Sequence, residues 1–539
     1  MQDVIPLILY KLSNKDRLML ISTCNKLLIF KKTVPFPDKV SYNRIRELSF
    51  FHNFEDVIID KNDNIPENIR IVRLTNWIDT YSHLETLNSF SKIEQIYFHC
   101  NYSTPKPTNI PQTLKKLVLF GNTFTNLFEN IPESVKYLKI KYPLECLNLV
   151  IKSNSIEQLI IKVFDLKLNH QSIPNSVKHL RLCCNNIGLY DDCFPNSIVS
   201  MFIDGFATSH NLNMPESITH LSFGPLFNTP IDDFLPKFLT HLTFDDKFNQ
   251  PLSHCMPKFL THLTFGKSYN YSLEDSLPHT LTHLVFGKYF SHIEHSRIPH
   301  SVTHLTIGTI KRMCYIPSSV THLTLCDNFN EEIDETFHSS LTHLVFGKYF
   351  NKSVDYCLPN SLSYLKFGKK FNLCIDALPR NLFHLEFGKN FNQPLSQLSY
   401  KRIPDTVKYL KFGKEFDQDI YNCLPRFLDE LIFGNSFNHS VEYCIPFTIK
   451  KLVFGNSFNL PIPHSIPYGT MYLEFGKHFN QSLENIPTTV TKLVLGKYFN
   501  KRINDHILPN VMHLVLNRRY IRNDQFNREM GFTKYIDYV

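Results

Sequence analysis

The strongest constraint on the fold is a sequence unit that returns about every 21 residues. From residue 215 onward an anchoring proline precedes almost every unit, and His338 takes its place in one. Five successive anchors lie 21 residues apart: Pro215, Pro236, Pro257, Pro278 and Pro299. Further prolines keep this phase as far as Pro509, and weaker units extend it back to about Pro66. Such a period is typical of a solenoid, in which each unit forms one coil and buries its apolar face only against its neighbours. The sequence therefore predicts a repeat solenoid of about 22 coils.

The unit itself predicts one short strand per coil. Its pattern is close to P-x-S-L-T-H-L-x-F-G-K-x-F-N, and the decapeptide LTHLVFGKYF occurs unchanged at 281–290 and 341–350. The anchoring proline cannot donate a ladder hydrogen bond, so the previous segment ends there. Apolar residues two apart, such as Leu344 and Phe346, have the period of a strand with one buried face. We expect a strand-rich solenoid, either β or α/β.

Glycine, phenylalanine and asparagine occupy fixed positions after the strand. One position holds twelve of the seventeen glycines, which indicates either a backbone conformation closed to other residues or a close approach of stacked coils. Three residues later comes a phenylalanine, such as Phe350, which should stack through the interior. The following asparagine, such as Asn351, is expected to form a ladder that satisfies the N–H and C=O groups of the turn.

Four tetrapeptides in this region resemble the FNIP repeat: FNTP at 227–230, FNQP at 248–251 and 391–394, and FNLP at 458–461. The resemblance covers residues 60–516 and is most specific from 215 onward. It implies a leucine-rich-repeat-like fold, although the asparagine here follows a phenylalanine and does not sit within an L-x-x-N motif. FNIP repeats are typical of social amoebae and of large DNA viruses that infect amoebae.

The first residues lack the repeat. The stretch ILYKLSNKDRLMLISTCNKL, residues 8–27, contains neither glycine nor proline and suits short amphipathic helices. It resembles the front of an F-box, which implies binding to a Skp-type adaptor and, through it, to a cullin. The alternative is a small helical segment that only caps the first coil. The adaptor-binding residues that the resemblance implies are Ile8, Leu9, Leu12, Asp16, Leu18, Leu20 and Cys24.

One row of side chains flanks the buried leucine of each strand and is predicted to line the exposed concave face. Histidine dominates its first part and tyrosine appears in its second. We expect these residues to contact a protein target: His220, His241, His262, His283, His304, His322, His343, Tyr364, Tyr409 and Tyr472. A metal-binding row of imidazoles is disfavoured, because histidine gives way to Tyr, Glu and Lys along the row. A second row of lysines follows the glycines and is expected to be a solvated edge.

Composition excludes several other function classes. The net charge of +8 is spread along the chain without a dense Lys/Arg run, so no nucleic-acid partner is expected. Thirteen cysteines without a C-x-x-C pair favour reduced thiols over a zinc or disulfide framework. No run reaches the length of a membrane span, and no catalytic motif, phosphate loop or cofactor fingerprint is found. We therefore expect a cytoplasmic protein (host cytoplasm if viral) without membrane, metal or cofactor.

Together these features predict a non-enzymatic interaction protein. The expected segments are 1–40 as an F-box-like segment or cap, 41–214 as degenerate repeats, 215–516 as well-formed repeats, and 517–539 as a C-terminal cap or tail. The favoured function is the substrate receptor of a cullin–RING ubiquitin ligase, with an unknown protein target on the solenoid. The alternative is a structural scaffold without a link to ubiquitin.

Overall fold

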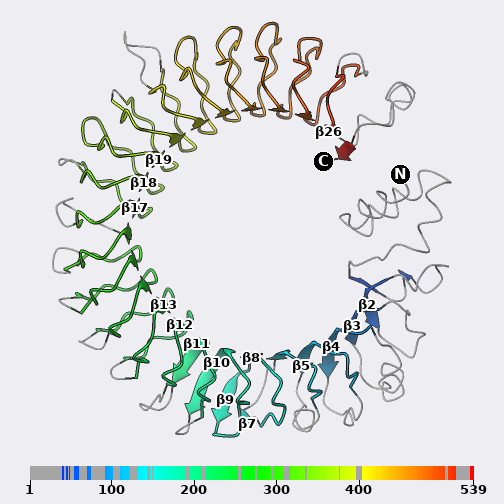
Figure 1. The fold of residues 1–539 in the computed structure, drawn as a ribbon, viewed down its shortest axis with the longest axis vertical. Coiled ribbons are helices and arrows are strands. Elements are labelled where there is room, and N and C mark those ends of the chain that lie inside the picture. The colour runs from blue at the N-terminus through cyan, green and yellow to red at the C-terminus, as the bar shows by residue number, and fades with distance from the viewer. Residues whose placement is uncertain are drawn as a thin grey trace. The chain divides into compact units, whose positions relative to one another are not determined.

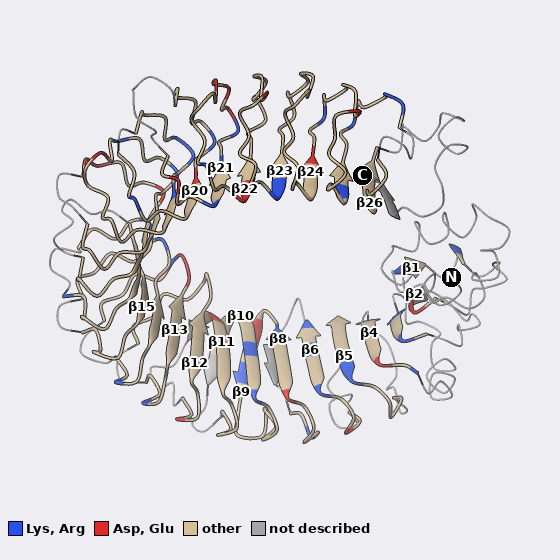
Figure 2. Ribbon diagram, turned by 45° about the horizontal axis from the view of Figure 1, so that its top comes forward, with Lys and Arg blue, Asp and Glu red and all other residues tan. Residues whose placement is uncertain are grey.

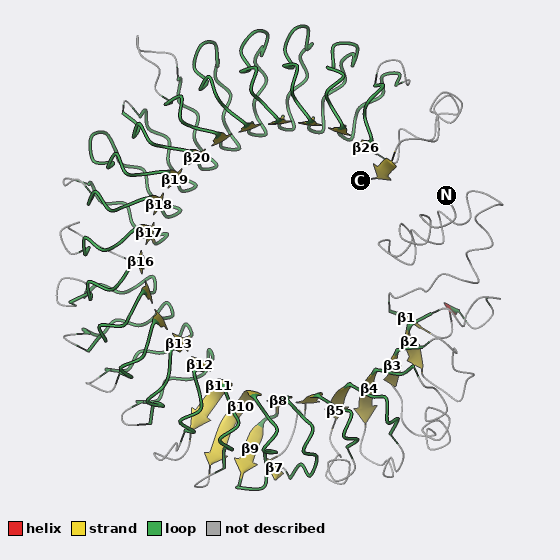
Figure 3. Cartoon of the chain, in the orientation of Figure 1, coloured by secondary structure: helices red, strands yellow, loops and turns green. Residues whose placement is uncertain are grey.

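The computed structural model divides into two compact units, residues 1–260 and 261–539. It describes residues 39–41, 44–45, 48, 54–59, 69–74, 92–100, 110–121, 131–141, 146–148, 150–189, 193–207, 214–231, 234–252, 256–273, 276–292, 297–308, 316–333, 337–375, 377–395, 403–503, 508–517 and 535–538. Figure 3 shows that the described residues form strands joined by loops and turns. None of them forms an α-helix.

In the first unit the strands pair in parallel. Two coils carry a second, short strand, so that β10 pairs with β8 along its first half and with β9 along its second. The strands are β1 (Val40–Ser41), β2 (Asp56–Ile59), β3 (Ile71–Leu74), β4 (Gln95–Cys100), β5 (Lys116–Gly121), β6 (Tyr137–Lys141), β7 (Cys146–Asn148), β8 (Gln158–Lys162), β9 (Asp165–Leu168), β10 (His179–Leu189), β11 (Ser200–Ala207), β12 (His220–Phe223) and β13 (His241–Phe244).

In the second unit each strand pairs in parallel with the next along the chain, and Figure 1 shows the strands on the inner side of this unit's coils. They are β14 (His262–Thr264), β15 (His283–Val285), β16 (His304–Ile307), β17 (His322–Leu325), β18 (His343–Val345), β19 (Tyr364–Lys366), β20 (His384–Glu386), β21 (Tyr409–Lys411), β22 (Glu430–Ile432), β23 (Lys451–Val453), β24 (Tyr472–Glu474), β25 (Lys492–Val494), β26 (His513–Leu516) and β27 (Tyr535–Tyr538).

Many strands start after a turn at the anchoring proline, and β18 starts after the same turn at His338, whose carbonyl accepts the N–H of Leu341 at 3.1 Å. In one coil the carbonyl of Pro359 accepts the N–H of Leu362 at 3.1 Å. The N–H of Tyr364 then bonds the carbonyl of Thr342, one coil earlier, at 3.0 Å. Within the strand Leu365 is fully buried, whereas Tyr364 and Lys366 face outward. The expected period of two is confirmed.

Two columns of aromatic rings fill the interior behind the strands. Phe346 and Phe350 of one coil stack with ring centroids 4.1 Å apart, and each also stacks on its counterpart one coil later. The distances are 5.4 Å from Phe346 to Phe367 and 6.1 Å from Phe350 to Phe371. All four side chains are at most 2% exposed. Because each ring contacts its own coil and the next, no coil can bury its phenylalanines alone.

The repeated glycine is required by the close approach of coils. A Cβ on Gly347 would lie 1.9 Å from the carbonyl oxygen of Cys326 in the preceding coil, and one on Gly368 would lie 1.7 Å from the carbonyl oxygen of Gly347. Both distances are far below van der Waals contact. Gly347 and Gly368 do not have positive φ angles, so of the two sequence-based alternatives the close approach is the correct one.

The predicted asparagine ladder is present. The side-chain oxygen of Asn330 accepts the main-chain N–H of Asn351 at 2.8 Å, and Asn351 does the same for Asn372. Asp417 occupies one position of the ladder and accepts the N–H of Asn438 at 3.0 Å. The position therefore requires a short side chain with an acceptor oxygen, which supplies a bond that no strand partner offers.

These observations confirm the expected fold class, a strand-rich, leucine-rich-repeat-like solenoid with coils of about 21 residues. Coil length nevertheless varies without disturbing the strand register. The anchors Pro299 and Pro317 are 18 residues apart and Pro379 and Pro404 are 25 apart, yet the strands on either side pair residue for residue. The N-terminal helical segment predicted within residues 1–40 lies outside the described residues, except for residues 39 and 40, where β1 starts.

Candidate functional site

Each residue of the row that is predicted to contact a target is the first residue of its strand. His220 and His241 begin β12 and β13 in the first unit, and their rings stack at 4.2 Å. In the second unit the row begins β14 to β19, β21 and β24 with His262, His283, His304, His322, His343, Tyr364, Tyr409 and Tyr472. All these side chains are partly or fully exposed. The outward placement expected from the sequence is therefore correct, while contact with a target stays a prediction.

The rings of the second unit form one continuous stack. From His262 to His343 the centroids of successive imidazoles lie 4.0 to 4.1 Å apart. The stack continues through Tyr364 at 5.5 Å, His384 at 4.4 Å and Tyr409 at 4.0 Å. His384 was seen in the sequence as part of this row but was not among the expected contact residues. Offset stacking at these distances holds the rings in place as a rigid surface.

A threonine before each histidine fixes the hydrogen bonding of the ring. The hydroxyl of Thr282 donates to the carbonyl of Thr261 at 3.1 Å and lies 2.9 Å from Nδ1 of His283. A hydroxyl has only one proton to donate, so Nδ1 must donate to Thr282 Oγ1. Thr342 and His343 repeat this arrangement. The neutral imidazoles therefore carry their proton on Nδ1 and leave Nε2 as an acceptor.

Burial and neighbouring imidazoles favour the neutral form of three rings in this stack. Desolvation, followed by the neighbouring rings of His343, His304 and His283, lowers the pKa of His322 to about 4. Desolvation is also the main cause that lowers the pKa values of His283 and His343. At neutral pH the face from β14 to β18 thus presents threonine, valine and imidazole side chains, with His283, His322 and His343 neutral. It suits a partner surface with hydrogen-bond donors better than one with a dense charge.

The stacking also bears on metal binding. Lone pairs on Nε2 lie in the ring planes, and successive rings are inclined by only 12 to 15°. Nearly parallel planes about 4 Å apart cannot direct two lone pairs at one ion at the usual Zn–N distance. Among the described residues no group of three or more His, Cys, Asp and Glu side chains could hold a metal ion.

Beyond β18 the sheet face becomes charged, and its centre is Glu386 on β20. Its carboxylate accepts a hydrogen bond from Nε2 of His384 at 3.0 Å and lies 3.3 Å from Nζ of Lys366 and 3.7 Å from Nζ of Lys411. The bond from His384, followed by the two lysines, lowers the pKa of Glu386 to about 2. Sequence reasoning missed this cluster, although it occupies the outward position two residues after the row, in the same three coils.

The charged part of the sheet face also carries tyrosines whose surroundings restrict them. Burial raises the pKa of Tyr409 to about 12. The hydroxyl of Tyr472 donates to Glu474 at 2.6 Å, and Nζ of Lys492 lies 5.3 Å from the Tyr472 ring. Each tyrosine therefore offers a fixed ring edge and a phenolic oxygen, the features that make tyrosine an effective contact residue.

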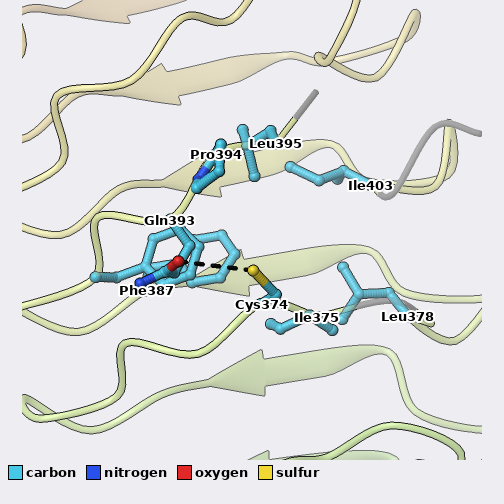
Figure 4. A pocket seen from close by; sticks show the side chains of 9 residues that line it. Cys374, Ile375, Leu378, Phe387, Gln393, Pro394, Leu395 and Ile403 are labelled. Atoms are coloured by element: carbon cyan, nitrogen blue, oxygen red, sulfur yellow. Dashed lines mark hydrogen bonds between the residues drawn. The ribbon is translucent and has the colours of Figure 1, made fainter. Parts of the chain in front are cut away.

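Cavities in the described residues are poor small-molecule sites. The apolar cavity in Figure 4 lies between the coils of β19 to β21, is lined by Ile375, Leu378, Phe387 and Leu395, and measures about 10 Å³. Cys374 Sγ and Gln393 Oε1, 3.6 Å apart, close one side of it. That volume is at the lower limit for one water molecule. A wider depression of about 490 Å³ lies in the first unit between Arg70, Lys92, Glu94, Thr113 and Lys115.

The expected adaptor-binding residues, Ile8 to Cys24, all lie outside the described residues. Among the described residues no helix could serve as a membrane-crossing segment.

Seven segments of the chain match the FNIP Repeat family: 210–247, 248–289, 269–309, 333–370, 400–436, 437–478 and 479–518. A FNIP repeat-containing protein of Acanthamoeba polyphaga mimivirus is 22% identical over 223 residues, which make up 41% of this chain and 42% of that protein's length. The FNIP repeats inferred from the sequence are thus confirmed.

Two solved structures are similar in fold. One, CroV588, is described as a circular leucine-rich-repeat protein; it is 24% identical, with a TM-score of 0.46 over 87% of this chain and 95% of that one. The other is YopM of Yersinia enterocolitica, at 16% identity, with a TM-score of 0.38 over 85% of this chain and 94% of that one.

Proposed function

We propose that this chain, which carries FNIP repeats on a leucine-rich-repeat-like solenoid, is a non-enzymatic protein-interaction scaffold whose sheet face binds a target. The observation that carries the proposal is the continuous outward row from His262 to Tyr409. Its rings are stacked on one another and its threonines are tied to the backbone, so the surface is rigid before any partner arrives. A preformed surface binds without the entropy cost of ordering its side chains.

We further propose that the scaffold is the substrate receptor of a cullin–RING ubiquitin ligase. The support is the F-box-like stretch at residues 8–27, with apolar residues at helical spacing around Asp16. In this arrangement the N-terminal segment holds the Skp-type adaptor and, through it, the cullin. The solenoid brings the target close to the ligase, so its contribution to ubiquitin transfer is proximity.

The test measures adaptor binding by the full-length protein. We expect the intact chain to retain purified Skp-type adaptor and a chain without residues 1–35 to lose it. Leu9→Asp combined with Leu20→Asp has the same effect, because a carboxylate on an apolar helix face is costly to bury. The matched control is Lys11→Gln combined with Lys15→Gln, which lowers the net charge by the same amount without removing apolar side chains.

Undiminished adaptor binding by the deletion variant, or equal binding by the Leu and Lys variants, contradicts the ubiquitin-ligase role. A scaffold whose N-terminus only caps the first coil is then the remaining interpretation. Thermal unfolding of each variant separates the two cases, since removing a cap lowers the melting temperature while charge changes in an adaptor site leave it unchanged.

A further inference from the structure

A group of five cations stands on the outward face of the first unit, on strands β5, β6, β8 and β10. The basic patch consists of Lys116, Lys139, Lys141, Lys162 and Arg181. On β6, Leu138 and Ile140 are fully buried, so Lys139 and Lys141 point to the opposite face. Figure 2 shows Lys and Arg positions in blue among the strands of this unit. The patch belongs to coils before residue 210, where the repeats are degenerate and no FNIP segment is matched.

The register places like charges directly side by side. Lys141 on β6 pairs with Lys162 on β8, and Ile160, two residues before Lys162, pairs with Arg181 on β10. Like charges at directly opposed positions of a sheet destabilise it. Lys141, Lys162 and Arg181 are all exposed, and a bound anion would remove their repulsion.

Carboxylates near the patch are already engaged elsewhere. Glu157 lies between Lys136 and Lys178, at 3.5 and 3.9 Å. Asp165 accepts a hydrogen bond from the side chain of Asn186, and Asp204 accepts the N–H of Leu226. Within the part of the chain that the structure describes, no ion pair joins a carboxylate to any of the five cations. The patch therefore has positive charge that the protein itself does not neutralise.

The aromatic rings next to the patch are covered by its cations. Arg181 lies over Phe202 with 4.0 Å between the guanidinium carbon and the ring centroid. Lys116 lies 4.8 Å from the centroid of Tyr137, and Lys141 lies 5.7 Å from that of Phe120. Single-stranded nucleic acid usually stacks its bases on open aromatic faces. Rings whose faces already hold a cation offer little room for stacking, so the patch favours a ligand that brings negative charge alone.

The spacing of the cations fits an extended chain. Alternate residues of a strand are about 6.7 Å apart, and neighbouring strands are about 4.8 Å apart. An extended peptide that runs along β6 presents every second side chain at the same repeat of about 6.7 Å, next to Lys139 and Lys141. Carboxylates at alternate positions can then each reach one lysine.

From this geometry we propose that the basic patch binds an acidic, carboxylate-rich extended segment of a partner protein. The inference rests on the proposed interaction role and names the class of partner for one surface of the scaffold. Binding is electrostatic, so it weakens as salt rises.

The experiment uses full-length protein and a fluorescent peptide of alternating Glu and Ser, with anisotropy as the readout. The patch variant replaces Lys139, Lys141 and Lys162 by Gln. The control variant replaces Lys369, Lys414 and Lys477 by Gln, which removes the same charge from the lysine row after the glycines. We expect the patch variant to bind about tenfold more weakly, the sum of three exposed ion pairs, and the control variant to bind like the wild type.

Three results would overturn the proposal. The first is equal affinity of the patch variant and the wild type, and the second is equal binding of the peptide with Gln in place of Glu. The third is an oligothymidylate that binds as tightly as the peptide and loses affinity in the patch variant, which would assign the surface to nucleic acid. Retention of the Skp-type adaptor by the same protein reports on the proposed function separately, because that contact lies in residues 1–35.

Discussion

The side-chain oxygen of Asn351 accepts the main-chain N–H of Asn372, one coil further along the chain, at 2.8 Å. The two residues are equivalent positions of successive repeats, so the same bond links many pairs of neighbouring coils. What the ladder needs is an acceptor at the tip of a short side chain, not an amide as such.

This requirement predicts different outcomes for two substitutions at one position. Asn351→Ala leaves the N–H of Asn372 without its acceptor and should lower the free energy of unfolding by about 1 kcal/mol. Asn351→Asp keeps the acceptor, as Asp417 does naturally, and should cost much less. Denaturant unfolding of both variants measures the difference. Equal losses would show that the ladder bond does not carry the effect.

The close approach of coils at the glycine position gives a second prediction. Gly347→Val forces a side chain against the carbonyl oxygen of Cys326 and should destabilise the protein by about 1–3 kcal/mol. The neighbouring Lys348→Ala changes only an edge side chain and should stay within about 0.5 kcal/mol of the wild type. Melting temperatures test both. A valine variant as stable as the alanine variant would refute the steric explanation.

The histidine stack predicts that stability falls in mild acid. Desolvation, followed by the neighbouring imidazoles, lowers the folded-state pKa of His322 to about 4, below an unfolded value of about 6.5. Above pH 6.5 neither state binds a proton at this ring. Between about pH 6.5 and pH 4 the unfolded chain binds protons that the folded chain does not, so stability decreases as pH falls.

The measurement is the melting temperature from about pH 7.5 down to pH 4, for the wild type and for His322→Tyr. Tyrosine occupies the same row at position 364 and stacks on His343, so the substitution keeps a ring and removes the titrating group. We expect a shallower decrease in the variant. Parallel curves would mean that His322 does not contribute to the acid sensitivity.

The tyrosines of the sheet face predict a loss of target binding. Changing Tyr364, Tyr409 and Tyr472 together to Ala should abolish capture of a target that the intact protein retains, because aromatic contact residues tend to dominate binding energy. The same three changes to Phe keep the ring stack and should retain most of the binding. The comparison variant alters Lys352 and Gln393, which lie away from this face. Loss of binding only in that last variant would place the target on the outer loops.

Much of the fold can be predicted from the sequence, because the same pattern occurs in many successive repeats. The period that neighbouring coils share predicts the burial of Leu344, Phe346 and Phe350. The turn before Asn351 predicts the role of its side chain. One question that the sequence left open, the reason for the glycine, needed the distance between Gly347 and the preceding carbonyl. No pattern in a single sequence contains that distance.

The surface was harder to predict because it depends on which residues the register sets side by side. To predict the hydrogen bond from His283 to Thr282, one must know that the threonine hydroxyl already donates to the carbonyl of Thr261 in the previous coil. The pairing of Lys141 with Lys162 lies in degenerate coils, where the extra strand β7 intervenes along the chain. Outward positions do not have to repeat, so the period predicts that a side chain faces outward but not which residues stand next to it.

Neighbouring strands keep the same register whatever the length of the coil between them. This has a consequence for how such a chain evolves. His304 pairs with His322 across an 18-residue spacing, and His384 with Tyr409 across a 25-residue spacing. Contacts between coils join equivalent residues, so a duplicated coil fits wherever it is inserted, and the decapeptide shared by 281–290 and 341–350 is what a recent copying event would leave. Gain or loss of one coil shifts every later side chain on the outward sheet face by about 4.8 Å. Copy number can therefore change the spacing of side chains on that face without a single point mutation in the core.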